Sequence, residues 1–323
     1  TMALSNSVNL SKIKKQFSQK NIKLGGKLNF QNDASNKIFQ LCKTANKTFL
    51  LLSFQNCPRD FQKYLRADQV LEMLDVPTPK ILEQHKSQKY FLMNYYPTNN
   101  SSQYYLKKEI KDVLSASVNK IINMQKKRKR FAGIPIKSKL NLMKNASQGI
   151  ETYIEYYDDK IQIGFYLNKL IQQSMKKNLD KLTKYTPTLA HGDFFLDNLI
   201  YFKKELYVID HQDLHYNHPC LDIASLIFDA RRSYSPKLEE KAIKDFARKS
   251  GQLLGPLRDD IHRVSLARNL RILGNWVNLY QAGKTQYLKK FRKYTWLQIF
   301  KHVEHLRLWD LRELFEEIYK KTK

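Results

Sequence analysis

One stretch of the chain, residues 188–213, combines acidic and amide side chains with two short apolar runs. Its first part places His191, Asp193 and Asn198 in a predicted loop. A short apolar and aromatic run follows, then a charged turn, then a second apolar run that ends at Asp210. Two apolar runs joined by a polar turn predict a β-hairpin. The stretch therefore predicts a loop, a hairpin, and an acidic residue where the second strand ends.

The spacing of these polar residues suits the transfer of a phosphoryl group to a hydroxyl. In kinase chemistry the protein positions an acceptor hydroxyl against the nucleotide γ-phosphate and neutralises charge through Mg²⁺. Asp193 and Asn198 have the spacing of the kinase catalytic loop, with Gly192 in place of its Arg and Phe194 in place of its Leu. We therefore predict that Asp193 is the catalytic residue that accepts the hydroxyl proton. Asn198 and Asp210 are the predicted metal ligands.

The same positions resemble the aminoglycoside phosphotransferase and choline kinase superfamily. Its catalytic loop is matched by residues 191–198, its metal strand by residues 209–210 and the helix start that follows by residues 221–226. The resemblance implies a bilobal, protein-kinase-like α+β fold, with a small antiparallel sheet in the N-terminal lobe and a larger, mostly helical C-terminal lobe. It also implies ATP and Mg²⁺ as cofactors. His191 and Asp222 are expected to support the catalytic loop, and Asp222 to be a helix N-cap as well.

Within that superfamily the chain most resembles the bacterial kinases that phosphorylate N-acetylmuramate and N-acetylglucosamine at the anomeric hydroxyl during cell-wall recycling. The stretches that carry this narrower resemblance are residues 32–35, 193–199, 209–213, 229–232 and 268–274, with residues 283–284 and 287–288 after the last of them. An N-acetylated amino sugar is the acceptor that it implies. Asp213, Arg268 and Asn269 are candidate sugar contacts. Asp213 could instead assist a metal or cap a turn, and Arg268 could be a surface charge with a buried stem.

Two domains are expected, a nucleotide-binding lobe over residues 1–96 and a catalytic and substrate-binding lobe over residues 97–323. The first lobe should open with an amphipathic helix over residues 8–20, and the Gly25-Gly26 pair should then break the chain. A helix is expected over residues 60–74, and strands over residues 28–30, 38–42, 48–54, 80–82 and 90–93. The second lobe should be mainly helical, with helices over residues 104–129, 161–182, 237–250, 257–280, 286–303 and 308–320.

The nucleotide side of the site is expected from two segments of the first lobe. Backbone N–H groups and the Ser35 hydroxyl, in the turn over residues 32–36, suit the binding of phosphates. Met93 and Tyr95 lie in a segment that resembles the link between lobes, where backbone groups bind adenine. The third strand should carry a Lys that reaches the α- and β-phosphates, but residues 47–54 offer only Leu or Ser at that place. The sequence leaves open which basic residue replaces it.

Composition narrows the class of partner. The net charge of +27 would attract phosphates, nucleic acid or an anionic membrane surface. The excess is mostly Lys spread through predicted helices, in a chain also rich in Asn, Ile and Tyr, as an AT-rich genome tends to encode. We therefore expect a small hydroxylated substrate rather than nucleic acid, and leave the oligomeric state open. No apolar run approaches the ~18 residues of a membrane span.

The cellular compartment is expected to be the cytoplasm. The three cysteines are odd in number and far apart in the chain, which argues against a disulfide framework. The first residues become polar within a few positions, so no secretory signal is expected. A reducing compartment fits both observations.

Two other functions stay open. A choline, ethanolamine or aminoglycoside kinase of the same superfamily would need carboxylates or an aromatic cage for a cationic acceptor. Tyr156, Tyr157, Asp158 and Asp159 could supply one. A kinase-shaped binding protein without catalysis would explain both the missing Lys and the positive charge.

Overall fold

The computed structural model describes residues 22–27, 37–97, 100–126, 130–161 and 165–323. It divides into two compact units, the first made of residues 1–102 and 199–213 and the second of residues 103–198 and 214–323. The helix expected over residues 8–20, the strand over residues 28–30 and the turn with Ser35 lie outside the described residues.

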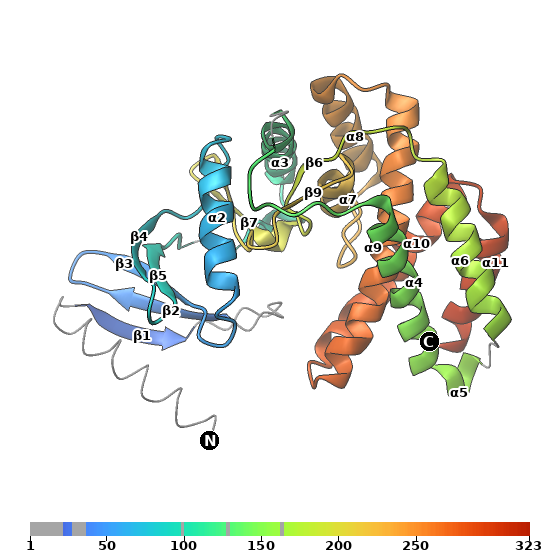
Figure 1. The fold of residues 1–323 in the computed structure, drawn as a ribbon, viewed down its shortest axis with the longest axis horizontal. Coiled ribbons are helices and arrows are strands. Elements are labelled where there is room, and N and C mark those ends of the chain that lie inside the picture. The colour runs from blue at the N-terminus through green and yellow to red at the C-terminus, as the bar shows by residue number, and fades with distance from the viewer. Residues whose placement is uncertain (1–21, 28–36, 98–99, 127–129, 162–164) are drawn as a thin grey trace. The chain divides into compact units, whose positions relative to one another are not determined.

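A five-stranded antiparallel sheet forms the centre of the first unit (Figure 1). In spatial order its strands are β1 (Lys23–Lys27), β2 (Ile38–Lys43), β3 (Thr48–Ser53), β5 (Tyr90–Asn94) and β4 (Ile81–His85). The last four lie where the apolar runs predict strands. The Gly25-Gly26 pair, expected to break the chain, lies inside β1, where the pairing with β2 shifts register between Leu24 and Lys27. A β-bulge thus absorbs the glycines without ending the strand.

Helix α2 (Asp60–Glu72) covers one face of this sheet. Its buried residues recur every three or four positions, and Phe61 and Tyr64 pack with Phe54 and Phe91. The rings of Phe61 and Phe91 stack with centroids 4.5 Å apart. Because side chains alternate along a strand, Leu52 joins this cluster while Leu51 packs on the opposite face with Cys42, Tyr90 and Leu92.

The predicted hairpin is present as β7 (Leu199–Phe202) and β8 (Glu205–Val208). It groups with the first unit, although the boundary expected near Tyr96 had left it in the second lobe. Two contacts explain the grouping. The Val208 N–H donates to the Pro77 carbonyl at 2.8 Å, and the ring centroid of Tyr207 lies 4.3 Å from that of Tyr96.

The second unit is mostly helical, as expected. Its helices are α3 (Ile110–Gln125), α4 (Lys139–Tyr156), α5 (Asp158–Ile161), α6 (Phe165–Asp180), α7 (Leu221–Ile227), α8 (Pro236–Ser250), α9 (Leu254–Gln281), α10 (Gln286–His305) and α11 (Trp309–Lys321). Strands β6 (Thr188–Ala190) and β9 (His215–Asn217) form a short antiparallel pair. The small sheet and the larger helical part confirm the predicted α+β class. None of the helices in the described ranges is long and apolar enough to cross a bilayer.

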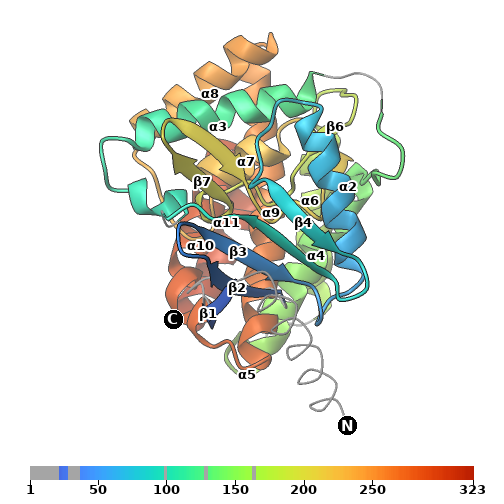
Figure 2. The ribbon, with the colours of Figure 1, turned by 90° about the vertical axis from the view of Figure 1, so that its left-hand side faces the viewer.

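Helices α4 and α9 pack side by side in both views (Figures 1 and 2) and meet at two glycines. A Cβ atom added to Gly274 would lie 2.5 Å from the carbonyl oxygen of Gly149. A Cβ atom on Gly149 would meet the backbone of Leu270 and Arg271. Backbone atoms cannot move aside as a flexible side chain can. The glycine contact therefore fixes α9 against α4.

Substitution of Gly274 by Ala should destabilise the protein, although Ala is normally the better helix residue. We expect Gly274→Ala to lower the free energy of unfolding by about 1–3 kcal/mol, the usual cost of overpacking. Urea denaturation measures the change. Gly255→Ala in the same helix is the matched control, because a Cβ atom there meets nothing within 4 Å. Equal effects of the two substitutions would contradict the packing interpretation.

Candidate active site

The predicted catalytic loop follows β6 and is held by a buried carboxylate. Asp222, fully buried near the start of α7, accepts the backbone N–H of His191 at 2.7 Å and that of Gly192 at 2.9 Å. The expectation that Asp222 is an N-cap is wrong, because α7 begins at Leu221 and its N-cap position is Cys220. The carboxylate instead satisfies loop N–H groups that burial would otherwise leave without partners.

Gly192 stands where the kinase pattern has an Arg, and the structure gives a steric reason. Its φ of +91° lies in the left-handed region, which residues with a Cβ atom rarely adopt. A Cβ atom would also lie 2.7 Å from Cε1 of His215 on β9. The imidazole of His191 is buried and its Nδ1 accepts the N–H of Asp193 at 3.3 Å. The loop thus turns sharply just before Asp193.

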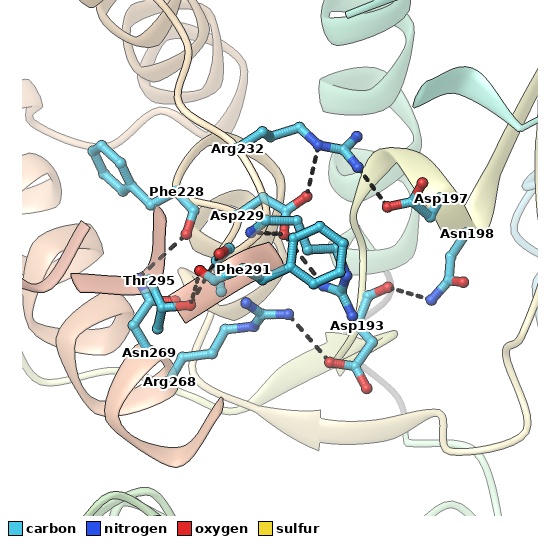
Figure 3. A network of polar contacts seen from close by, with 12 residues as sticks. Asp193, Asp197, Asn198, Phe228, Asp229, Arg232, Arg268, Asn269, Phe291 and Thr295 are labelled. Carbon is cyan, nitrogen blue, oxygen red and sulfur yellow. Dashed lines mark hydrogen bonds and ion pairs between the residues drawn. The ribbon is translucent and has the colours of Figure 1, made fainter. Parts of the chain in front are cut away.

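The carboxylate of Asp193 is half exposed and is held by two guanidinium groups of α9. Its Oδ1 lies 3.2 Å from Nη2 of Arg268 and 3.3 Å from Nη2 of Arg271; Figure 3 shows the first contact. Partial burial alone would raise the pKa of Asp193, but Arg271, Arg268 and Arg231 hold that pKa well below its usual range. Asp193 is therefore ionised at neutral pH.

Arg268 is itself nearly buried, with a side-chain exposure of 2 %. Its Nε and Nη1 have no hydrogen-bond partner within the described part of the chain. Burial lowers the pKa of Arg268 to about 10, with Asp193 opposing and Arg271 adding to the effect. Arg231 lies over the ring of Phe195 at 3.9 Å from its centroid. Three guanidinium groups thus act on the carboxylate of Asp193.

Asn198 follows Asp193 on the short 3₁₀ turn η2 (Leu196–Asn198). Its Nδ2 donates to the backbone carbonyl of Asp193 at 2.9 Å (Figure 3). Because the amide nitrogen is engaged, the amide oxygen is the atom left to serve as a metal ligand. The neighbouring carboxylate of Asp197 pairs with Arg232, whose Nε lies 3.3 Å from Oδ2 of Asp229. This network fixes the turn that carries Asn198.

Asn269 occupies a different environment from Arg268. It is fully buried, and its Nδ2 lies 3.3 Å from both the Phe228 carbonyl and Nε2 of His302. Consecutive helix positions point about 100° apart, so Asn269 cannot share the direction of Arg268. A packing role fits Asn269 better than contact with an acceptor.

The predicted metal ligand Asp210 belongs to the first unit and comes two residues after β8. It has a φ of +61° and a side-chain exposure of 36 %. Its Oδ1 accepts hydrogen bonds from the amine of Lys37 and, at 3.1 Å, from Nε2 of Gln212. The Lys37 amine also donates to Oε1 of Gln212 at 3.0 Å. Asp213, which follows, is exposed.

The sequence did not single out Lys37. A Lys was expected on the third strand, whereas Lys37 directly precedes the second, and nothing local marks it as different from its many neighbours of the same type. Met93, a predicted nucleotide contact, has its side chain buried in the cluster under α2, so only its backbone could meet a base. Tyr95 follows β5 and is half buried.

Asn198 in the second unit and Asp210 in the first each carry an oxygen donor of the type that Mg²⁺ prefers. This ion usually takes one or two protein carboxylates and completes its shell with water and substrate phosphates. Within the described ranges no group of three or more His, Cys, Asp or Glu side chains is placed to hold a metal ion.

The fold and the catalytic loop define a kinase-like phosphotransferase. Residues 29–259 match the sequence model of the phosphotransferase enzyme family. The chain belongs to this family, and the prediction of an enzyme that phosphorylates a hydroxyl acceptor is confirmed. No curated protein matches the chain by sequence.

Several solved structures share the fold at low sequence identity. Choline kinase LicA from Streptococcus pneumoniae is 16% identical with a TM-score of 0.61, over 92% of this chain and 98% of its own. The ADP-bound aminoglycoside phosphotransferase APH(2'')-Ib is 17% identical with a TM-score of 0.62, over 89% of this chain and 96% of its own. A putative aminoglycoside phosphotransferase from Ralstonia eutropha is 13% identical with a TM-score of 0.62, over 96% and 98% respectively. At this level of identity the similarity shows the fold alone.

Removal of the buried carboxylate should loosen the catalytic loop. Asp222→Ala leaves two backbone N–H groups without their acceptor, and we expect the free energy of unfolding to fall by about 2–4 kcal/mol. Denaturant unfolding measures this. The exposed Asp112 on α3 provides the matched control, since Asp112→Ala should change stability by no more than about 0.5 kcal/mol. A loss for Asp222→Ala no larger than that of the control would refute the bracing role.

Proposed function

We propose that the protein is an ATP- and Mg²⁺-dependent phosphotransferase that acts on an N-acetylated amino sugar at its anomeric hydroxyl. Membership of the phosphotransferase family supports the reaction class. The half-exposed, ionised carboxylate of Asp193 beside three guanidinium groups is the observation that carries the choice of acceptor.

Each residue has a separate task in this proposal. Asp193 accepts a hydrogen bond from the acceptor hydroxyl and aligns its oxygen. A carboxylate with a low pKa is a weak base, which suits a loose transition state in which the hydroxyl proton is transferred late. Asn198 and Asp210 supply oxygen ligands to Mg²⁺, which offsets phosphate charge when it is bound. Ser35, Met93, Tyr95 and Asp213 remain predicted contacts for nucleotide or sugar.

The charges around Asp193 favour an acceptor that is not a cation. Choline, ethanolamine and the aminoglycosides carry positive charge, and like charges near Arg268, Arg271 and Arg231 repel it. An N-acetylated amino sugar has an amide in place of a charged amine. Its hydroxyl groups can also accept hydrogen bonds from the unpaired Nε and Nη1 of Arg268.

The candidate aromatic cage for a cation is already flanked by cations of the protein. The amine of Lys160 lies 5.7 Å from the ring centroid of Tyr157, and the guanidinium of Arg292 lies 6.0 Å from it. Nη1 of Arg292 also donates to the Tyr157 hydroxyl at 3.1 Å. Tyr156 packs edge-on against Tyr157 and Tyr280. These contacts disfavour a choline or aminoglycoside site at this position.

Replacement of the catalytic carboxylate separates the enzyme proposal from a non-catalytic protein. We expect Asp193→Asn to lower kcat by about 10²–10⁴-fold, the usual contribution of a positioned base, with little effect on ATP affinity. Mg²⁺-dependent ADP release measures turnover with N-acetylglucosamine, N-acetylmuramate, choline and kanamycin as acceptors. Asp197→Asn is unsuitable as a control because Asp197 is buried and pairs with Arg232; Asp112→Asn, at an exposed position of α3, serves instead.

The outcomes of this panel are distinct. Turnover of an N-acetylated sugar that Asp193→Asn removes supports the proposal. Turnover of choline or kanamycin alone would overturn the acceptor class but keep the reaction. ATP binding without turnover of any acceptor would leave the acceptor proposal without support, and full activity of Asp193→Asn would exclude Asp193 as the catalytic residue.

The arginines should also set the pH dependence of the reaction. Because they lower the pKa of Asp193, this carboxylate stays ionised at pH values below about 4, which is the ordinary pKa of an Asp side chain. Arg271→Gln removes one positive charge, so the acid limb of kcat/KM should move to higher pH. Arg248→Gln, which removes an exposed charge on α8, is the control. An acid limb that stays in place in Arg271→Gln would show that Asp193 does not set it.

A further inference from the structure

Strand β3 has no lysine among its six residues, Thr48–Ser53. The nearest one along the chain, Lys47, is exposed and precedes the strand, where Thr48 pairs with Lys43 at the end of β2. The opposite end of the same strand pair is different. There Ile38 pairs with Ser53, and Lys37 directly precedes Ile38.

The pairing register places Lys37 on the face of the sheet that α2 covers. Residues directly opposite in an antiparallel pair share a face, and side chains two apart along a strand do so too. Phe39 pairs with Leu52, and both pack in the cluster under α2. Lys37 is two residues before Phe39. A lysine at this place is therefore one strand, about 4.8 Å, away from the strand on which kinases usually carry theirs.

The side chain of Lys37 is only 3 % exposed, and its amine lies between two side-chain oxygens of the segment after β8. Burial of a lysine amine is unfavourable unless a charged partner and hydrogen bonds compensate it. Asp210 and Gln212 provide these. A buried cation paired with a predicted metal ligand is the arrangement expected where phosphates and a metal later bind.

The segment that carries Asp210 is anchored to α2. His211 is fully buried, its ring centroid lies 4.1 Å from that of Tyr64, and its Nε2 lies 3.5 Å from Oδ1 of Asp68. Asp210 itself adopts a positive φ, which is uncommon for a residue with a Cβ atom. The fold thus holds its carboxylate next to the Lys37 amine at the cost of backbone strain.

We propose that Lys37 binds the nucleotide phosphates in place of the lysine that β3 lacks. In the absence of nucleotide its amine neutralises Asp210. When nucleotide and metal bind together, the phosphates become the partner of Lys37, and Asp210 is released to the metal. This inference rests on the proposed function for its nucleotide, but it concerns which residue of the chain contacts the phosphates.

Two binding measurements on Lys37→Met test this inference through changes of opposite sign. The affinity for MgATP should fall by about 10–100-fold, as expected for the loss of a hydrogen bond between charged groups, while the affinity for adenosine stays the same. The affinity for Mn²⁺ alone should rise, because the amine no longer competes for Asp210. Calorimetry measures nucleotide binding and water proton relaxation measures bound Mn²⁺.

Lys47→Met is the matched control and should alter none of these affinities. Lys37→Arg keeps the charge and should restore part of the MgATP affinity. Thermal unfolding of each variant without ligand checks that the fold is intact. If Lys37 had only a structural role, adenosine and MgATP affinities would fall together, and Mn²⁺ affinity would not rise.

The inference and the proposed function can fail separately. MgATP affinity that is unchanged in Lys37→Met, in a protein that phosphorylates an acceptor, overturns the role of Lys37 and keeps the function. Weaker MgATP binding in Lys37→Met, with no acceptor phosphorylated by the wild type, supports Lys37 and overturns the acceptor proposal. A wild-type protein that binds no nucleotide overturns both.

Discussion

The buried carboxylate of Asp222 is the interaction on which the catalytic loop depends. The loop turns at Gly192 with a left-handed backbone. Asp222 accepts two of these N–H groups from α7. Burial of this carboxylate raises its pKa, and the loop N–H groups oppose that rise. Loop and helix therefore depend on each other.

Each of the two units contains a carboxylate paired with cationic side chains. In the second, Asp193 is held by Arg268 and Arg271, and in the first, Asp210 is held by Lys37. Each carboxylate predicted to act in phosphoryl transfer thus has a cationic partner of the protein itself. Ion pairs of this kind keep charges compensated while substrates are absent. A substrate that binds beside such an ion pair must therefore form a more favourable interaction with one of the two charged side chains than they form with each other.

The sequence predicted what is local and missed what is distant. The hairpin before Asp210 was predicted correctly because both of its strands lie within one short stretch, and Asp193 and Asn198 were proposed from spacing within the same stretch. Arg271 was overlooked beside Arg268, although two residues three positions apart share a helix face. Asn269, the residue after Arg268, is fully buried in the helical core. The pairing of Lys37 with Asp210 joins residues 173 positions apart, and no local pattern announces such a contact.

The first unit is assembled from two separate parts of the chain, residues 1–102 and 199–213. During translation the sheet is synthesised first. Residues 103–198, about a third of the chain, must then be synthesised before β7 and β8. Until then Pro77 lacks the N–H of Val208, and Lys37 lacks Asp210. Contacts between remote segments slow folding because a long loop must close first. The sheet is therefore synthesised before the carboxylate that pairs with Lys37, and the first unit gains its full set of contacts only after residues 199–213 are made.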